Sequence, residues 1–206
     1  MQRTKRIFSV NFKDFSLYLP FILFALLFLI GVLVGNLTVG NFDFIKGYTK
    51  DSFQSFLDIR KEGIWYNILG DAAFKLLPVY VLMFLSGTSV IGSVLSPLFL
   101  FVFGLKYGFI TGYLYFTYSL NGIIFNCLIL LPSVVVSLLG IIILCIESFN
   151  FSLVISKICT RSEKITNVYL HFKSYCIKSS ATLISAVLTI ICDILFSTMF
   201  IGFFEF

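Results

Sequence analysis

Charged residues are scarce in this sequence. Of its 206 residues, 15 are Lys or Arg and 10 are Asp or Glu, so only 12% carry a charge. Soluble domains average roughly 25%. Hydrophobic residues make up 59%, and a soluble domain of this size, which still exposes about 30% of its unfolded surface, could not hide them from water. The shortage of charge therefore excludes a cytosolic enzyme, a nucleic-acid-binding module and a disordered tail, and it indicates an integral membrane protein.

Metal-binding and catalytic side chains are also few. The one histidine is His171, and the five cysteines form no Cys-x-x-Cys pair. Because a structural zinc site needs about four nitrogen or sulfur ligands held close together, we expect no metal and no cofactor. The sequence shows no Ser-His-Asp pattern, no pair of acids within one apolar segment and no glycine-rich phosphate loop. We therefore expect that the chain is not an enzyme.

Five apolar segments are long enough to cross a membrane, which takes about 20 mostly apolar helical residues. They cover residues 17–39, 72–91, 94–118, 122–146 and 179–204. The first exceeds the about 7–15 apolar residues of a signal peptide, so we expect it to be retained. The segments predict an all-α polytopic membrane protein in which residues 1–206 form a single integral membrane domain. Residues 86–93 are rich in Ser and Gly, which leaves a re-entrant or broken element there as an alternative.

The positions of Lys and Arg predict the orientation of this domain. Residues 1–16 hold four, residues 147–178 hold five and residues 40–71 hold four. With five crossings, the first two stretches lie on one side of the membrane and the third on the other, giving nine against four. Since cytoplasmic loops carry the excess of Lys and Arg, we expect a multi-pass protein with its N-terminus in the cytoplasm and its C-terminus outside.

The segment 40–71 is the largest one predicted to lie outside. Within it, Phe53, Phe56 and Leu57 fall at helical spacing among charged residues. This pattern predicts a short amphipathic helix on the outer leaflet, with Trp65 at the level of the lipid headgroups. A merely solvated connector is the alternative. On the first interpretation, Phe53, Phe56, Leu57 and Trp65 are the candidates for docking a partner protein.

Two ionisable residues lie near the middle of predicted crossings. Lys106 is about 12 residues along the third segment and Asp193 about 14 along the fifth, so their depths are similar. A charge at membrane depth is costly unless it faces protein or water. We expect Lys106 to form a buried ion pair with Asp193, or with Glu147 at the inner end of the fourth segment. The alternative is that Lys106 extends along the membrane toward an interface.

Glycines recur every four residues in two of the segments: Gly31 and Gly35 in the first, and Gly104, Gly108 and Gly112 in the third. Small residues at this interval let helix backbones approach closely in a membrane. The stripes therefore predict helix packing. The contact is either between segments of this chain, which we favour, or with another membrane protein.

Two stretches in the middle of the chain carry a resemblance to a known family. Phe84–Gly92 reads FLSGTSVIG, and Phe101–Leu114 reads FVFGLKYGFITGYL. Together with the Leu131-Pro132 pair, they resemble the stage II sporulation protein M family, whose second block has a lysine followed by spaced glycines. The match is incomplete, because Tyr107 stands where that block usually has a glycine.

The resemblance implies a non-enzymatic membrane scaffold that acts during engulfment in bacterial sporulation. Its partners would be membrane-anchored peptidoglycan hydrolases, an amidase/endopeptidase and a lytic transglycosylase, together with the lipid bilayer and no nucleic acid. Its location would be the bacterial cell membrane, at the mother-cell septal or engulfing membrane. Two other classes stay open. One is a membrane subunit of an ABC-type or other transporter, with residues 147–178 as the landing site of an ATPase, and the other is a channel built around Lys106.

Overall fold

The computed structural model describes residues 12–161 and 168–204, whose regular structure is entirely helical. This confirms the all-α fold expected from the sequence. The elements follow in the order α1 (Phe12–Asn41), α2 (Asp43–Lys61), α3 (Trp65–Gly87), α4 (Gly92–Phe125), the π-helical turn η1 (Asn126–Leu130), α5 (Leu131–Arg161), α6 (Val168–Phe200) and the 3-10 turn η2 (Ile201–Phe203).

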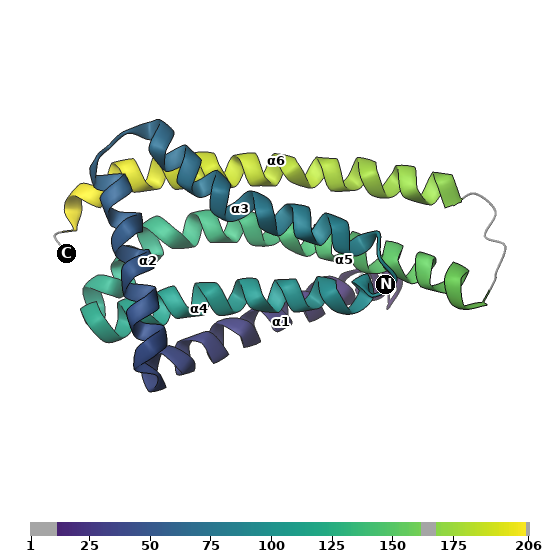
Figure 1. The fold of residues 1–206 in the computed structure, drawn as a ribbon, viewed down its shortest axis with the longest axis horizontal. Coiled ribbons are helices and arrows are strands. Elements are labelled where there is room, and N and C mark those ends of the chain that lie inside the picture. The colour runs from purple at the N-terminus through teal and green to yellow at the C-terminus, as the bar shows by residue number, and fades with distance from the viewer. Residues whose placement is uncertain (1–11, 162–167, 205–206) are drawn as a thin grey trace, which may run out of the picture.

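Five of the helices in the described residues run along the long axis of the molecule, and α2 lies across one end of them (Figure 1). Leu19–Asn41, Trp65–Gly87, Gly92–Cys159 and Val168–Phe203 are long and apolar enough to cross a membrane. The third stretch has 68 residues, more than twice the roughly 20 that one crossing needs. Its two halves, α4 and α5, run in opposite directions (Figure 1). The chain is therefore a multi-pass membrane protein.

The chain reverses direction near the end of α4. Ser119 has a φ of 50° and a ψ of −121°, which breaks the helix and is a conformation that glycine adopts more easily than serine. A Cβ on Gly122 would lie 2.2 Å from the carbonyl oxygen of Leu114, so a glycine is needed for the chain to fold back so closely. This reversal lies at the end of the bundle where α2 crosses (Figure 1). We call this end of the bundle the α2 end.

The turn between α3 and α4 lies at the opposite end of the bundle (Figure 1). Only four residues separate Gly87, where α3 ends, from Gly92, where α4 begins. The Ser152 hydroxyl of α5 donates a hydrogen bond to the carbonyl of Ser89 and accepts one from the amide of Ser93, each over 2.8 Å. Of the alternative for residues 86–93, the broken element is thus present as a short turn that α5 fixes in place, and no separate re-entrant segment lies between α3 and α4.

Glycines line the contact between α1 and α4. A Cβ on Gly31 would lie 3.2 Å from the Cα of Gly104, and one on Gly35 would lie 3.0 Å from the Cα of Gly108. At such separations the two backbones are almost in contact, which is the arrangement that small residues permit in membranes. Gly112, the last glycine of the stripe, lies against Asn36 instead. Of the two alternatives for the glycine stripes, the structure places them in packing within the chain.

Replacing Gly108 by Ala should destabilise the protein, because the added Cβ would lie 2.4 Å from the carbonyl oxygen of Val32. Overpacking of this kind typically costs about 1–3 kcal/mol. Gly47 in α2 is the matched control, since its Cβ would meet nothing within 4 Å. Gly47→Ala should be neutral or stabilising by roughly 0.5–1 kcal/mol. Thermal unfolding of each variant in detergent measures the difference, and equal melting temperatures for the two variants would contradict the packing described here.

Candidate functional site

Helix α2 presents one buried face to the bundle. Thr49, Phe53, Leu57 and Arg60 are its buried residues, and they recur at intervals of three or four. Neighbouring positions such as Lys50, Asp51 and Asp58 are exposed. The amphipathic helix is therefore present, and its apolar face packs on the chain's own helices.

The aromatic residues of α2 are covered by the reversal between α4 and α5. The Phe53 ring lies edge-on to Phe125, with 5.5 Å between ring centroids, and 5.9 Å from the ring of Tyr113. Leu57 is buried in the same cluster. The prediction that Phe53 and Leu57 dock a partner is therefore wrong. Both side chains are buried against the chain's own helices, because the apolar face of α2 covers the end of the bundle.

The other two docking candidates lie differently. Phe56 is partly buried, and the guanidinium carbon of Arg60 lies 3.4 Å from its ring centroid, which is a cation–π contact. Trp65, at the start of α3, is exposed and packs its ring edge-on against Tyr66. Of the four predicted docking residues, Trp65 is thus the one with an accessible side chain.

Arg60 is the centre of a buried charge cluster that joins three helices. Its guanidinium donates hydrogen bonds to Asp193 of α6 and, over 3.2 Å, to Asp71 of α3. It also donates to the carbonyl of Phe56 in its own helix. Lys75, one turn along α3, pairs with Asp71 over 2.8 Å. Within the described residues, the Arg60 Nε is buried without a hydrogen-bond partner.

The members of this cluster differ in how much their removal should cost. The side chains of Arg60 and Asp193 are 2% and 10% exposed, and breaking such a buried pair by removing one partner costs about 3–5 kcal/mol. The Lys75 side chain is 55% exposed, so its pair with Asp71 is worth about 0–1 kcal/mol. Arg60 therefore holds α2 in place, and Lys75 adds little.

The expected pairing of Lys106 with Asp193 or Glu147 is wrong. Asp193 pairs with Arg60, and Glu147 accepts a hydrogen bond from Lys178 over 2.8 Å. Lys106 itself is exposed. The reason lies in the helical period: Lys106 is two residues from both Gly104 and Gly108, hence about 200° around the helix from the face that packs on α1.

The depth of Asp193 also differs from the sequence estimate. Helix α6 begins at Val168, well before the predicted start of the fifth segment. Asp193 lies seven residues before the end of α6, which is about 10 Å from the α2 end. Lys106 lies 12 residues before Tyr118, or about 18 Å from the same end. The two groups are therefore not level with one another.

Arg60 is not among the predicted site residues, because in the sequence it lies in a segment where it counts as a loop charge. Its position carried a signal, however: it is three residues after Leu57 and seven after Phe53, and so lies on the apolar face of the amphipathic helix. An arginine on such a face requires acidic partners from the helices that cover it. Asp71 and Asp193 are those partners.

Replacing Arg60 by Met should destabilise the protein by about 3–5 kcal/mol, because Asp193 would remain buried without its partner. Adding Asp193→Asn should restore part of the loss by removing that charge. Lys75→Met is the matched control and should change stability by about 0–1 kcal/mol. Thermal and denaturant unfolding in detergent measure these changes. An Arg60→Met variant no less stable than Lys75→Met would show that the cluster does not hold α2.

Lys106→Leu should leave both membrane accumulation and melting temperature unchanged, because the side chain is exposed and has no ion-pair partner among the described residues. Asp193→Leu in the same assay should lower both, since it leaves Arg60 buried and unpaired. Equal losses of accumulation and melting temperature in the two variants would instead indicate that Lys106 and Asp193 form an ion pair.

The α2 end of the molecule is thus a helix fixed across a bundle, with one face buried and the other accessible. The accessible face mixes charged residues with exposed Phe44 and Tyr48, and Trp65 follows on α3. This arrangement can bind a protein surface while keeping a constant position relative to the membrane. No protein-family model, curated protein or solved structure matches this chain.

Proposed function

We propose that the chain is a non-enzymatic membrane scaffold that recruits peptidoglycan hydrolases to the septum during engulfment in bacterial sporulation. The observation that carries the proposal is α2, which buried Arg60 fixes across one end of the bundle. A scaffold must present a surface of constant orientation, and α2 is such a surface. The resemblance of the central glycine motifs to the sporulation family supplies the identity of the partners.

The distribution of basic residues supports an α2 end outside the cell. The start of α1 and the facing ends of α5 and α6 lie at the end opposite α2 (Figure 1). In the sequence, the stretches 1–16 and 147–178, which include the described start of α1 and the facing ends of α5 and α6, hold nine Lys and Arg against four in 40–71. By the positive-inside rule, α2 then faces the cell wall, where its partners act.

The accessible face of α2 carries the proposed contact. Phe44, Tyr48, Asp51, Ser55 and Asp58 recur at intervals of three or four, and all five are exposed. They lie on the side of the helix opposite its buried residues. Aromatic residues are enriched in the centres of protein interfaces, so Phe44 and Tyr48 are the proposed anchors of a hydrolase.

Replacing Phe44 and Tyr48 by Ala should reduce hydrolase co-purification from sporulating cells at least tenfold, because two central aromatic anchors typically contribute more than the about 1.4 kcal/mol that tenfold represents. Membrane accumulation should not change, since both side chains are exposed. Phe74→Ala is the matched control: Phe74 is 83% exposed on the crossing helix α3. Undiminished recovery of the hydrolases with the double variant would contradict the proposed contact.

A transporter subunit is the second candidate, and one observation favours it. Helix α5 continues nine residues beyond Ser152, which bonds to the α3–α4 turn, so it extends about 14 Å past that turn. Exposed Lys157 and Lys173 lie on the extended parts of α5 and α6, where an ATPase could bind. Recovery of an ATPase and no hydrolase in the same pull-down would favour this candidate over the scaffold.

A further inference from the structure

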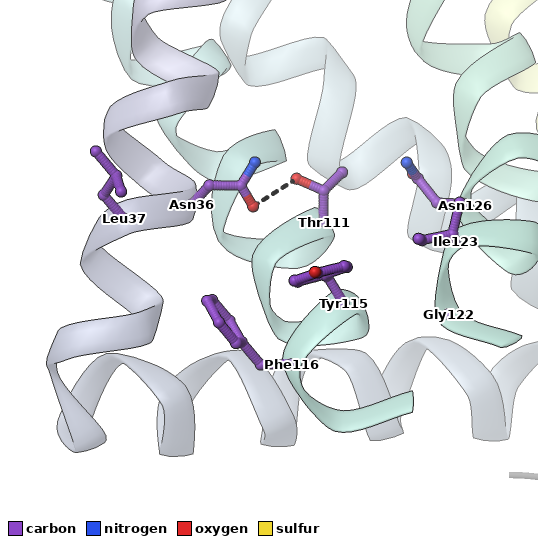
Figure 2. Close-up of a pocket in the computed structure, with 8 residues that line it drawn as sticks. All are labelled: Asn36, Leu37, Thr111, Tyr115, Phe116, Gly122, Ile123 and Asn126. Carbon is purple, nitrogen blue, oxygen red and sulfur yellow. Dashed lines mark hydrogen bonds between the residues drawn. The ribbon is translucent and has the colours of Figure 1, made fainter. Parts of the chain in front are cut away.

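A cavity of about 370 Å³ opens at the α2 end, between α1 and the reversal of α4 (Figure 2). Small-molecule sites span about 300–1,000 Å³, so this one is large enough for part of a ligand. Its lining contains the polar residues Asn36, Thr111, Tyr115 and Asn126 and no charged side chain. It shares no residue with the charge cluster at Arg60.

Exposed side chains line the cavity, and apart from Tyr115 the large ones are purely apolar. Leu37 and Phe116, from α1 and α4, line it with large exposed side chains, as does Ile123 beyond the reversal. All three belong to stretches apolar enough to cross a membrane. A lipid in the membrane can therefore reach the cavity past apolar side chains.

Two asparagine side chains that line the cavity have amide N–H groups without an acceptor among the described residues. Thr111 donates to the Asn36 Oδ1 over 3.3 Å, and Tyr107 donates to the Asn126 Oδ1 over 3.0 Å (Figure 2 draws the first of these). Both bonds use the oxygen of the amide. In the part of the chain that the structure describes, no hydrogen bond uses the Nδ2 of Asn36 or Asn126. Neither Nδ2 is among the buried side-chain atoms without a partner in the described residues, so both are accessible and free to donate to a ligand with acceptor oxygens.

Gly112 leaves room for the side-chain amide of Asn36 beside the cavity. A Cβ on Gly112 would lie 2.7 Å from the Asn36 Oδ1, so a larger residue would displace the amide. The third glycine of the α4 stripe thus faces a polar side chain, whereas Gly104 and Gly108 face the glycines of α1. Its position is explained by the Asn36 amide rather than by backbone contact alone.

With the α2 end placed at the outer edge of the headgroup layer, the depth of the cavity matches the boundary between acyl chains and headgroups. Asn36 lies five residues before the end of α1, and Thr111 lies seven residues before Tyr118, which places them about 8–10 Å from the α2 end. The hydrocarbon core is about 30 Å of a total of about 40–45 Å, so each interfacial layer is roughly 5–8 Å thick. The glycerol esters of phospholipids lie at the inner edge of that layer.

We infer that the cavity binds one glycerophospholipid, whose ester carbonyl oxygens accept hydrogen bonds from the Nδ2 groups of Asn36 and Asn126. The acyl chains leave past the apolar side chains of Leu37 and Phe116. Because no charged side chain lines the cavity, it does not select the headgroup by charge. The site is independent of hydrolase recruitment, since it requires the purified chain and lipid only.

The test uses the full chain, reconstituted in vesicles of phosphatidylglycerol and phosphatidylethanolamine, extracted into detergent and examined by native mass spectrometry. The wild type should retain one lipid of either class. Asn36→Leu with Asn126→Leu should retain it at least fivefold less, because each lost hydrogen bond weakens binding several-fold. Asn67→Leu is the matched control: Asn67 lies at the α2 end outside the cavity and bonds Glu62, so retention should not change.

A second variant keeps the proposal testable if the leucines disturb folding. Asn36→Ala with Asn126→Ala removes both Nδ2 donors without adding bulk or charge, so it should also lose the lipid while its circular dichroism stays that of the wild type. Three results would overturn the proposal: no lipid on the wild-type chain, equal retention by wild type and the alanine variant, or retention confined to phosphatidylglycerol.

Discussion

The position of α2 depends on one buried cation. A guanidinium enclosed by protein is costly unless acidic partners lie within hydrogen-bond distance, and Arg60 meets that requirement only where α2, α3 and α6 come together. The cluster therefore limits where α2 can lie as well as attracting it to α3 and α6. A different placement of α2 would leave Arg60, Asp71 and Asp193 without partners, so these three residues specify where the helix crosses the end of the bundle.

The rest of the α2 end follows from this placement. With α2 fixed, Phe53 covers the aromatic residues at the reversal of α4, and the exposed face with Phe44 and Tyr48 points away from the bundle. The close packing of α1 on α4 is set separately, by glycines. It leaves the cavity at Asn36 between α1 and the reversal of α4. On our proposals, one end of the molecule combines a surface for a protein partner with a cavity for a lipid.

Much of this fold could be predicted because its determinants are local. The length of each apolar segment predicts a crossing helix, and the spacing of Phe53, Phe56 and Leu57 predicts an amphipathic helix, since both depend only on helical geometry. Partners are a different matter. Asp193 and Lys106 lie in apolar segments and look equivalent in sequence, yet one is buried against α2 and the other faces outward. That difference depends on which faces of the helices pack together. Sequence spacing alone does not show this, although Gly104 marks the face of α4 that packs on α1. The apolar face of α2 was likewise predicted correctly. That the chain's own helices cover this face was not predicted.

The most direct test of the account is the distance between α2 and α6 in a lipid nanodisc. Spin labels at the exposed positions Ser55 and Thr198, in a background with the native cysteines replaced, report it by electron paramagnetic resonance. If Arg60 fixes α2, the otherwise wild-type protein has a single narrow distance, and replacing Arg60 by Met gives a broad distribution. A broad distribution with Arg60 present, or a narrow one that survives its replacement, would contradict the claim that this residue fixes α2 across the bundle.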